Sequence, residues 1–229
     1  SRERIMAEIM AAARCRLGEA GAAGLSLREV ARDIGMVSSA VYRYVDSRDD
    51  LLTRLIIEDY DLLGAVAEDA AREPAASDLD RWIMTARAVR QWALDNPHDY
   101  LLLYGTPVPG YAAPESTVPA ATRVTFALVR IIRDADLAGR LEPAIGPLPS
   151  PNTQLAADLG ELLNVLNETD EGPAPVADAA TVLAFLVAWT QLFGQISFEL
   201  TNQTRDVITD HAAFFDAAVR RLGHQIGLR

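Results

Sequence analysis

The stretch Leu25–Arg48, LSLREVARDIGMVSSAVYRYVDSR, holds two short helical patterns separated by a glycine. The first pattern spaces its apolar residues by three and four, which puts them on one face of a helix: Leu27, Val30, Ala31 and Ile34. Gly35 follows, where the end of a helix favours a residue that tolerates positive φ. The second pattern carries its apolar side on Val41, Tyr44 and Val45. The stretch therefore predicts two helices joined by a tight turn.

Cap signals agree with this division. Ser26 precedes the first helix and Glu29 follows three residues later, the order of a capping box, and Ser38 is placed to cap the second helix. The expected shared core consists of Val30, Ile34, Met36 and Val41. This spacing is typical of a helix-turn-helix, whose second helix enters the major groove by its N-terminal end. A generic helical hairpin is the alternative interpretation.

Composition and charge limit the classes of protein to which the chain can belong. The chain has 229 residues, half of them hydrophobic, so it can bury a sizeable core. The net charge is −11, but residues 1–48 carry 8 arginines against 6 acids, a net of +2, and the remainder carries −13. A basic N-terminal end on an acidic body suits a protein that touches phosphates with one end only.

Signs of catalysis and export are missing from the sequence. Cys15 is the single cysteine, so no internal disulfide is possible, and the histidines His98, His211 and His224 show no metal-ligand spacing. No phosphate loop, nucleophile elbow or signal peptide is found. We expect a cytoplasmic protein that is not an enzyme, with no cofactor, catalytic residue or bound metal.

One segment is apolar enough to raise the question of a membrane. Residues 179–198 carry no charge over about the length that spans a bilayer. Polar residues interrupt the segment, and Asp178 and Glu199 bracket it closely. We interpret it as a buried or interface helix rather than a membrane span.

Along the chain the patterns are helical throughout, and the predicted fold class is all-α. The expected helices are 2–17, the pair within 25–45, 48–71, 78–94, 97–104, 120–137, 153–167, 176–201 and 206–223. The helix from Arg48 is too long for a small N-terminal unit and should run into the body. Proline- and glycine-bearing loops are expected at 105–119, 141–152 and 168–175.

The run from Gly24 to Leu52 resembles the DNA-binding domain of TetR-type transcriptional regulators. The resemblance lies in the Ala31–Gly35 spacing, in Tyr42-Arg43-Tyr44, and in a basic Arg48 before Leu51-Leu52. Two positions depart from the usual pattern, because the family commonly has an aromatic residue at Val45 and lysine at Arg48. Farther on, the chain is similar to WHG-type ligand-binding domains at Asn96-Pro97 through Gly110-Tyr111, Trp189, Phe193-Gly194 and Phe198-Glu199-Leu200.

The resemblance implies a set of residues that contact double-stranded operator DNA: Arg28, Ser38, Ser39, Tyr42, Arg43, Tyr44 and Arg48. Their chemistry fits, since the Arg28 guanidinium matches O6 and N7 of guanine and the Tyr42 hydroxyl can bind a phosphate. Arg48 is expected to bind phosphate. For Tyr44 a role in the core, and for Arg43 a solvated charge, are equally acceptable interpretations.

The resemblance also implies a homodimer, and the last two predicted helices, 176–201 and 206–223, support it. They carry more apolar surface than one small body would hide, including Phe198, Phe214 and Phe215. A two-fold four-helix interface is expected, and the dimer would read a palindromic operator.

A small-molecule effector is the remaining partner that the family implies. The candidate ligand-binding residues are aromatic: Trp82, Trp92, Tyr100, Tyr104, Tyr111, Phe126 and Trp189. At helical spacing, each is also explained as ordinary core. His98 and Asp99 could recognise a polar group, but a capped helix start explains them equally well.

The sequence thus predicts a three-helix helix-turn-helix domain over residues 1–47 and a larger helical-bundle domain for ligand binding and dimerisation over residues 48–229. The expected function is a homodimeric repressor that a small molecule releases from its operator. A helical interaction or architectural protein without a small-molecule ligand is the alternative.

Overall fold

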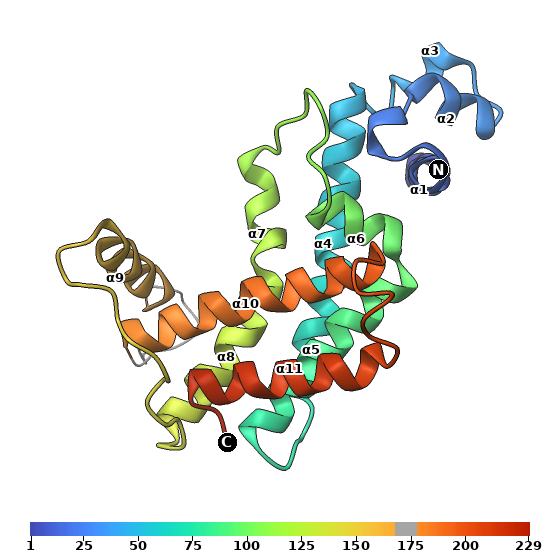
Figure 1. Cartoon of the computed structure of the whole chain (residues 1–229). Coiled ribbons are helices and arrows are strands. Elements are labelled where there is room, and N and C mark those ends of the chain that lie inside the picture. Colours follow the sequence, from blue (N-terminus) through green and yellow to red (C-terminus); the bar gives the residue numbers. More distant parts are fainter. Residues whose placement is uncertain (168–177) are drawn as a thin grey trace. The chain divides into compact units, whose positions relative to one another are not determined.

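The computed structural model describes residues 1–167 and 178–229, with no side-chain description at Asn167. Within these residues the chain is helical and contains no strand, which confirms the all-α prediction (Figure 1). The α-helices are α1 Arg2–Ala20, α2 Leu27–Asp33, α3 Ser38–Val41, α4 Arg48–Arg72, α5 Asp78–Asp95, α6 Pro97–Tyr104, α7 Val118–Ala121, α8 Arg123–Leu137, α9 Gln154–Asn167, α10 Ala179–Leu200 and α11 His211–Ile226. Two short 3-10 helices are η1 Ala22–Gly24 and η2 Glu115–Thr117.

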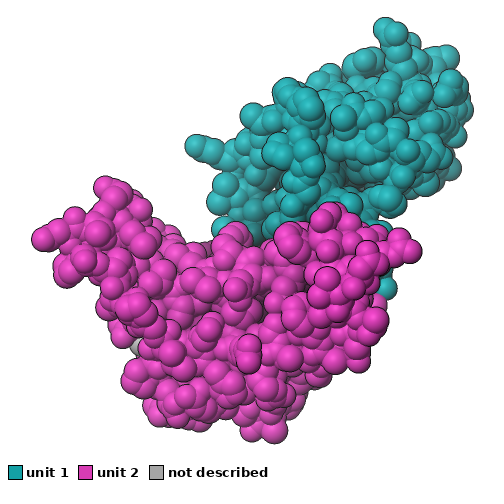
Figure 2. Space-filling model, in the orientation of Figure 1, with its two compact units in different colours: residues 1–64, 93–122 teal, residues 65–92, 123–229 magenta. Residues whose placement is uncertain are grey.

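The helices group into two compact units (Figure 2). Unit 1 holds residues 1–64 and 93–122, and unit 2 holds residues 65–92 and 123–229. The division falls inside α4 and α5, so α4 carries residues of both units. This division describes packing; the functional boundary at residues 47 and 48 remains a prediction.

Unit 1 is built on the apolar faces of α1, α2, α3 and the first half of α4. Its buried side chains form one cluster: Ile9, Met10, Ala13, Leu17, Leu25, Leu27, Val30, Ala31, Val41, Val45, Leu51, Leu52 and Leu55. Ile34, Met36 and Tyr44 pack against it half-buried. The helical periodicity read from the sequence therefore selects the correct faces.

Unit 2 is a helical bundle in which α10 and α11 lie side by side (Figure 1). The predicted inward faces of two further helices are buried: Trp82, Ala86 and Val89 of α5, and Val124, Ala127, Leu128 and Ile131 of α8. Arg133 on α8 donates through Nη2 to the carbonyl oxygen of Leu166 at 2.7 Å, which fastens α9 to α8. Arg90 on α5 forms an ion pair with Glu199 on α10.

Three helix ends differ from the prediction in the N-terminal stretch. α1 continues past Gly18 to Ala20, because the chain leaves the helix at Gly21, where φ is 67°. Ser26 precedes α2, but its side chain makes no capping hydrogen bond. Ser38 is the first residue of α3 rather than its cap; Val37 takes the cap position. By contrast, α4 has a side-chain cap, since Ser47 Oγ accepts from Asp50 N at 3.0 Å.

The segment from 105 to 137 was predicted as a loop followed by one helix. The structure places η2 and α7 at the end of the loop, and Thr122 separates α7 from α8. Pro119 lies in the first turn of α7, where its missing N–H costs nothing. Helical structure thus begins at Glu115, within the stretch 105–119 that the sequence predicts as a loop.

The prediction of α11 as residues 206–223 was wrong at both ends. The helix begins at His211, with Asp210 Oδ1 accepting from Ala213 N at 2.9 Å, and residues 201–207 form turns. It ends at Ile226, followed by Gly227 at φ 107°. α10 begins at Ala179 after the cap Asp178. The predicted loop 168–175 and the predicted start of α10 at 176 lie outside the described residues.

Among the described residues, α10 alone is long and apolar enough to cross a bilayer. That test considers length and composition only, and core helices also pass it. One face of α10 is buried by the protein itself, including Val182, Phe185, Ala188 and Leu192.

Candidate nucleic-acid interface and effector residues

The turn between α2 and α3 is fixed by backbone hydrogen bonds. Gly35 takes φ 70°, and Met36 N donates to the carbonyl oxygen of Ala31 at 2.8 Å. Ala31, Val30 and Val41 are fully buried at the junction of the two helices. Because neither helix can shift without opening this core, the two helices present their outer side chains as one rigid surface.

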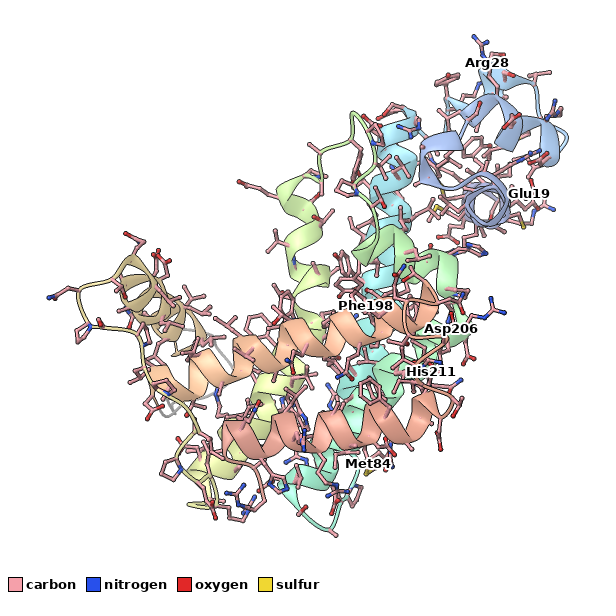
Figure 3. The ribbon with its side chains drawn as sticks, in the orientation of Figure 1. Glu19, Arg28, Met84, Phe198, Asp206 and His211 are labelled. Atoms are coloured by element: carbon pink, nitrogen blue, oxygen red, sulfur yellow. The ribbon has the colours of Figure 1, made fainter. Side chains whose placement is uncertain are left out.

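Five of the seven predicted DNA-contacting residues are exposed on that surface: Arg28, Ser38, Ser39, Tyr42 and Arg43. Tyr42 is 50% exposed although it is a large aromatic residue. Figure 3 shows Arg28 on the outer side of α2. The set therefore combines a guanidinium able to read a base edge with hydroxyls able to bind phosphate.

Tyr44 is half-buried and packs against the unit 1 core. The guanidinium of Arg2 lies over its ring, 5.6 Å from the centroid, and Arg2 Nη2 donates to the carbonyl oxygen of Arg43 at 3.1 Å. The first turn of α1 therefore contacts the residues that directly follow α3, Arg43 and Tyr44. No local sequence pattern predicts this contact, since Arg2 and Arg43 are 41 positions apart.

Arg48 is turned toward the backbone of the connection between α1 and α2. Its Nη2 donates to the carbonyl oxygen of Ala22 at 2.8 Å, and its Nε donates to that of Leu25 at 3.1 Å. Asp49 lies 3.5 Å from Nη1. The residue thus has a structural role beside the phosphate contact that the resemblance implies, and that contact remains a prediction.

Arg16 forms a further contact between α1 and α2 that the sequence did not predict. It holds Asp33 of α2 with two hydrogen bonds of 2.6 Å. These bonds lower the pKa of Asp33, against the smaller opposing effect of desolvation. The ion pair neutralises an acidic side chain on the basic N-terminal part of the chain.

The predicted ligand-binding residues are divided between the two units. Tyr100, Tyr104 and Tyr111 belong to unit 1, while Trp82, Trp92, Phe126 and Trp189 belong to unit 2. In unit 1 the ring centroids of Tyr100 and Tyr104 are 5.0 Å apart, and the Tyr111 hydroxyl is 2.9 Å from Thr53 Oγ1. Burial raises the pKa of Tyr104. These contacts are those of a packed core.

In unit 2, Trp82 is fully buried and its indole N–H donates to the carbonyl oxygen of Val219 at 3.0 Å. The Trp189 ring lies 5.5 Å from that of Phe193 on the same helix, and Trp92 is half-buried. Phe126 lines a cavity of about 90 Å³. Its other walls are Glu68, Ala71, Arg72, Arg123, Ala127 and Arg130. A ligand role for these aromatic residues remains a prediction.

A larger and more apolar groove, of about 390 Å³, lies along α10 and α11. Its lining residues are Thr190, Gln191, Gly194, Gln195, Phe198, Glu199, Thr204, His211, Phe214 and Phe215. Phe198 and Phe214 are 56% and 43% exposed. Figure 3 shows Phe198 on α10 and His211 at the start of α11. None of the predicted ligand-binding residues lines this groove.

Comparisons with known proteins place the chain in a family. Residues 9–55 match the family described as bacterial regulatory proteins, tetR family, and residues 82–222 match the tetracyclin repressor-like C-terminal domain. The chain is 42% identical to the HTH-type transcriptional regulator Rv1816 of Mycobacterium tuberculosis, over 97% of this chain and 92% of that protein. The chain belongs to the TetR family of bacterial regulatory proteins.

Solved structures agree with this assignment. The protein SCO4313, whose crystal structure is known, is 34% identical, with a TM-score of 0.73 over 96% of both chains. RolR, crystallised with the ligand resorcinol, is 15% identical with a TM-score of 0.54, covering 96% of this chain and 88% of that one, and shares the fold. The chain is a DNA-binding transcriptional regulator and not an enzyme, as the sequence predicts. The WHG subtype of the C-terminal domain remains a prediction.

Proposed function

We propose that the protein is a cytoplasmic homodimeric repressor that binds a palindromic operator and is released by a small-molecule effector. The observation that carries the proposal is the rigid outer surface of α2 and α3, where Arg28 and Tyr42 project from a fully buried core. The family membership supports DNA as the partner of this surface.

The exposed apolar side of α10 and α11 supports a homodimer. Val187 and Phe198 on α10 and Phe214 on α11 are each more than 40% exposed, which is unfavourable on a free surface. Gly194 lies among them, and a methyl group placed there would meet no atom within 4 Å. A second copy could therefore approach this face closely, in a two-fold arrangement of four helices.

The cavity beside Phe126 supports a small effector with an acidic or phenolic group. Three of its lining residues are arginines, of which Arg72 and Arg123 pair with Glu68, and Phe126 supplies an aromatic wall. The resorcinol bound by RolR is a precedent for a small phenol in this fold. α4 contributes Glu68 and Arg72 to the cavity and also carries residues of unit 1, so it offers a continuous path for coupling.

The decisive experiment selects duplexes from a random DNA pool with the full-length chain. Enrichment of a palindrome whose half-sites lie about one helical turn apart supports the proposal. Arg28→Ala should then relax the preference at one base pair per half-site, by about 1–3 kcal/mol. Arg32→Ala is the matched control, since it removes the same charge from the other end of α2 and should weaken all sequences alike. A pool that shows no enriched sequence would refute sequence-specific binding.

The effector is tested separately. Small phenols and aromatic acids are screened by thermal shift, and operator affinity is measured with and without a compound that binds. A repressor of this type loses operator affinity when the effector binds. A bound compound that leaves the operator affinity unchanged contradicts effector release.

A further inference from the structure

Unit 1 contains a buried carboxylate with a hydrogen-bond partner at only one of its two oxygens among the described residues. Asp59 on α4 is fully buried. Its Oδ1 accepts a hydrogen bond of 2.6 Å from Nη2 of Arg14 on α1. Its Oδ2 is buried and has no hydrogen-bond partner among the described residues. A buried charged oxygen in this state is costly, so the group calls for an explanation.

The surroundings of Asp59 carry an excess of negative charge. Arg14 also lies 3.5 Å from Glu58 on α4 and 3.7 Å from Asp99 on α6. Three carboxylates from two helices thus share one guanidinium from a third, and the formal charge of these four groups is −2. Asp59 and Asp99 are shielded from solvent, while Glu58 is half-exposed.

His98 on α6 is a further titratable group near Gly18 of α1. A methyl group placed on Gly18 would lie 3.4 Å from Cδ2 of His98, so the imidazole lies against α1. Burial raises the pKa of the neighbouring Asp99, while the charges of Arg14 and, to a smaller extent, His98 lower it. Both residues therefore belong to the contact between α1 and α6.

Burial is the main reason why Asp59 favours its protonated form. Desolvation raises its pKa to about 6, the Arg14 hydrogen bond opposes the rise, and the charges of Asp99 and Glu58 add to it. If α1 moves away from α4, water reaches Asp59 and its pKa returns toward the ordinary value of 3.8. The docked arrangement of α1 thus binds the proton more tightly than the undocked one.

We propose that Asp59 is a proton-binding site that strengthens the docking of α1 onto α4 and α6 as the pH falls below neutrality. Once Asp59 is neutral, its carboxyl group still accepts from Arg14, and the guanidinium charge is balanced by Asp99 and Glu58. Protonation of Asp59 is the only chemical change that this proposal involves. The residues concerned on α1, α4 and α6 all belong to unit 1.

The size of the effect follows from proton linkage. A group whose pKa is about 6 when docked and 3.8 when exposed favours docking roughly tenfold more at pH 5 than at pH 7.5. The added stability of the docked arrangement is present at low pH and is lost as the pH rises through the pKa of buried Asp59. The reason is that burial destabilises the charged form of the carboxyl group.

The consequence for DNA rests on the proposed function. α1 contributes Ile9, Ala13 and Leu17 to the same core as Val30 and Ala31 of α2. Firm docking of α1 therefore fixes the DNA-binding surface, and operator affinity should rise with proton uptake at Asp59.

The test is hydrogen–deuterium exchange of the full-length chain at pH 5 and pH 7.5, corrected for intrinsic exchange rates, with peptides of α5 as the internal reference. In the wild type, peptides of α1 should open about tenfold less often at pH 5. In Asp59→Asn, which is neutral and of the same shape, the protection of α1 should be equally high at both pH values. Glu58→Gln is the matched control and should keep the pH dependence.

Two results would overturn the proposal. The first is equal protection of α1 at both pH values in the wild type. The second is loss of the pH dependence in His98→Asn together with its survival in Asp59→Asn, which would make the imidazole the titrating group. Carboxyl carbon NMR of the wild type gives a readout free of substitution, and a midpoint for Asp59 near 4 would also refute the proposal.

Operator binding is then measured by fluorescence anisotropy with the selected duplex at the same two pH values. Affinity that rises toward pH 5 in the wild type but not in Asp59→Asn supports the link to DNA. A chain that binds no duplex would refute the proposed function, whereas the exchange experiment would still decide the role of Asp59.

Discussion

The guanidinium of Arg48, at the start of α4, donates to the carbonyl oxygen of Ala22 with a separation of 2.8 Å. Because its Nε also donates to Leu25, one side chain closes the connection between α1 and α2 onto α4. The residue that the family resemblance assigns to phosphate therefore also holds the DNA-binding helices in place.

The first prediction follows from this double role. Arg48→Ala should lower the stability of unit 1 by about 1–3 kcal/mol, because it leaves partly buried carbonyl groups without a charged donor. Urea unfolding followed by the fluorescence of a probe in unit 1 measures the change. Tyr42→Phe is the comparison, since it removes an exposed hydroxyl and should weaken DNA binding at unchanged stability. A stable Arg48→Ala variant would show that the carbonyl contacts matter little.

The second prediction concerns the apolar face of α10 and α11. Phe214→Glu should weaken self-association at least tenfold, because a charge would be buried at the proposed interface. Sedimentation velocity over a range of concentrations measures the dimer fraction. Leu62→Glu on α4, at a side chain that is 48% exposed, is the control and should leave the dimer intact. Equal effects of both variants would point away from this interface.

Gly223 gives the third prediction. A methyl group placed there would lie 2.5 Å from Cδ1 of Leu79 and 3.1 Å from Cδ1 of Trp82. Gly223→Ala should therefore destabilise unit 2 by about 1–3 kcal/mol through overpacking. Thermal unfolding monitored by circular dichroism gives the value. Gly194→Ala, at a helical glycine with open space around it, should not destabilise the monomer.

Trp82 gives the fourth prediction, which separates a core role from a ligand role. Trp82→Phe removes the donor to the Val219 carbonyl and part of a fully buried side chain, so stability should fall by about 1–3 kcal/mol. Effector affinity, measured by calorimetry at a temperature where both proteins are folded, should stay the same. A variant that keeps its stability but loses the effector would restore Trp82 as a ligand contact.

The fifth prediction is a pH dependence in unit 2. Arg123 on α8 holds both carboxylate oxygens of Glu68, at 2.8 and 2.9 Å. These hydrogen bonds lower the pKa of Glu68 below its ordinary value of 4.5, although desolvation acts the other way. The stabilisation is therefore complete above pH 4.5 and is lost as the pH falls through the lowered pKa.

Arg123→Gln should raise the pKa of Glu68 toward 4.5, as carboxyl carbon NMR would show. It should also reduce the loss of stability between pH 5 and pH 3. Arg205→Gln removes the same charge from the connection between α10 and α11 and serves as the control. An unshifted Glu68 in Arg123→Gln would mean that the ion pair does not set its protonation.

Gly35 and Gly223 show most clearly which structural roles can be predicted from the sequence and which cannot. Gly35 follows an apolar helical face and precedes a second one, so its role in the turn is visible in the local pattern, and φ 70° confirms it. Gly223 looks like the end of a helix for the same reason, yet it is needed inside α11 because Leu79 and Trp82 occupy the space of its side chain. Both glycines follow apolar helical residues, and only the packing distinguishes them.

The aromatic residues show the same limit. Their helical spacing predicts that they face inward, and Trp82 and Tyr100 are indeed fully buried. Spacing along one helix does not say which aromatic side chains from different helices meet, and the seven candidates fall into two separate units.

The sequence by itself determined the all-α class, the helix-turn-helix with its glycine turn, and the family, because these depend on residues three or four apart and on a short contiguous motif. The tertiary structure decided that Arg48 holds the backbone around Ala22, that Gly223 makes room for Trp82, and that Arg14 from α1 meets Asp59 and Asp99. Those relationships join residues far apart in the chain. Their energies come from burial and from the partners that folding supplies, and neither can be read from a local pattern.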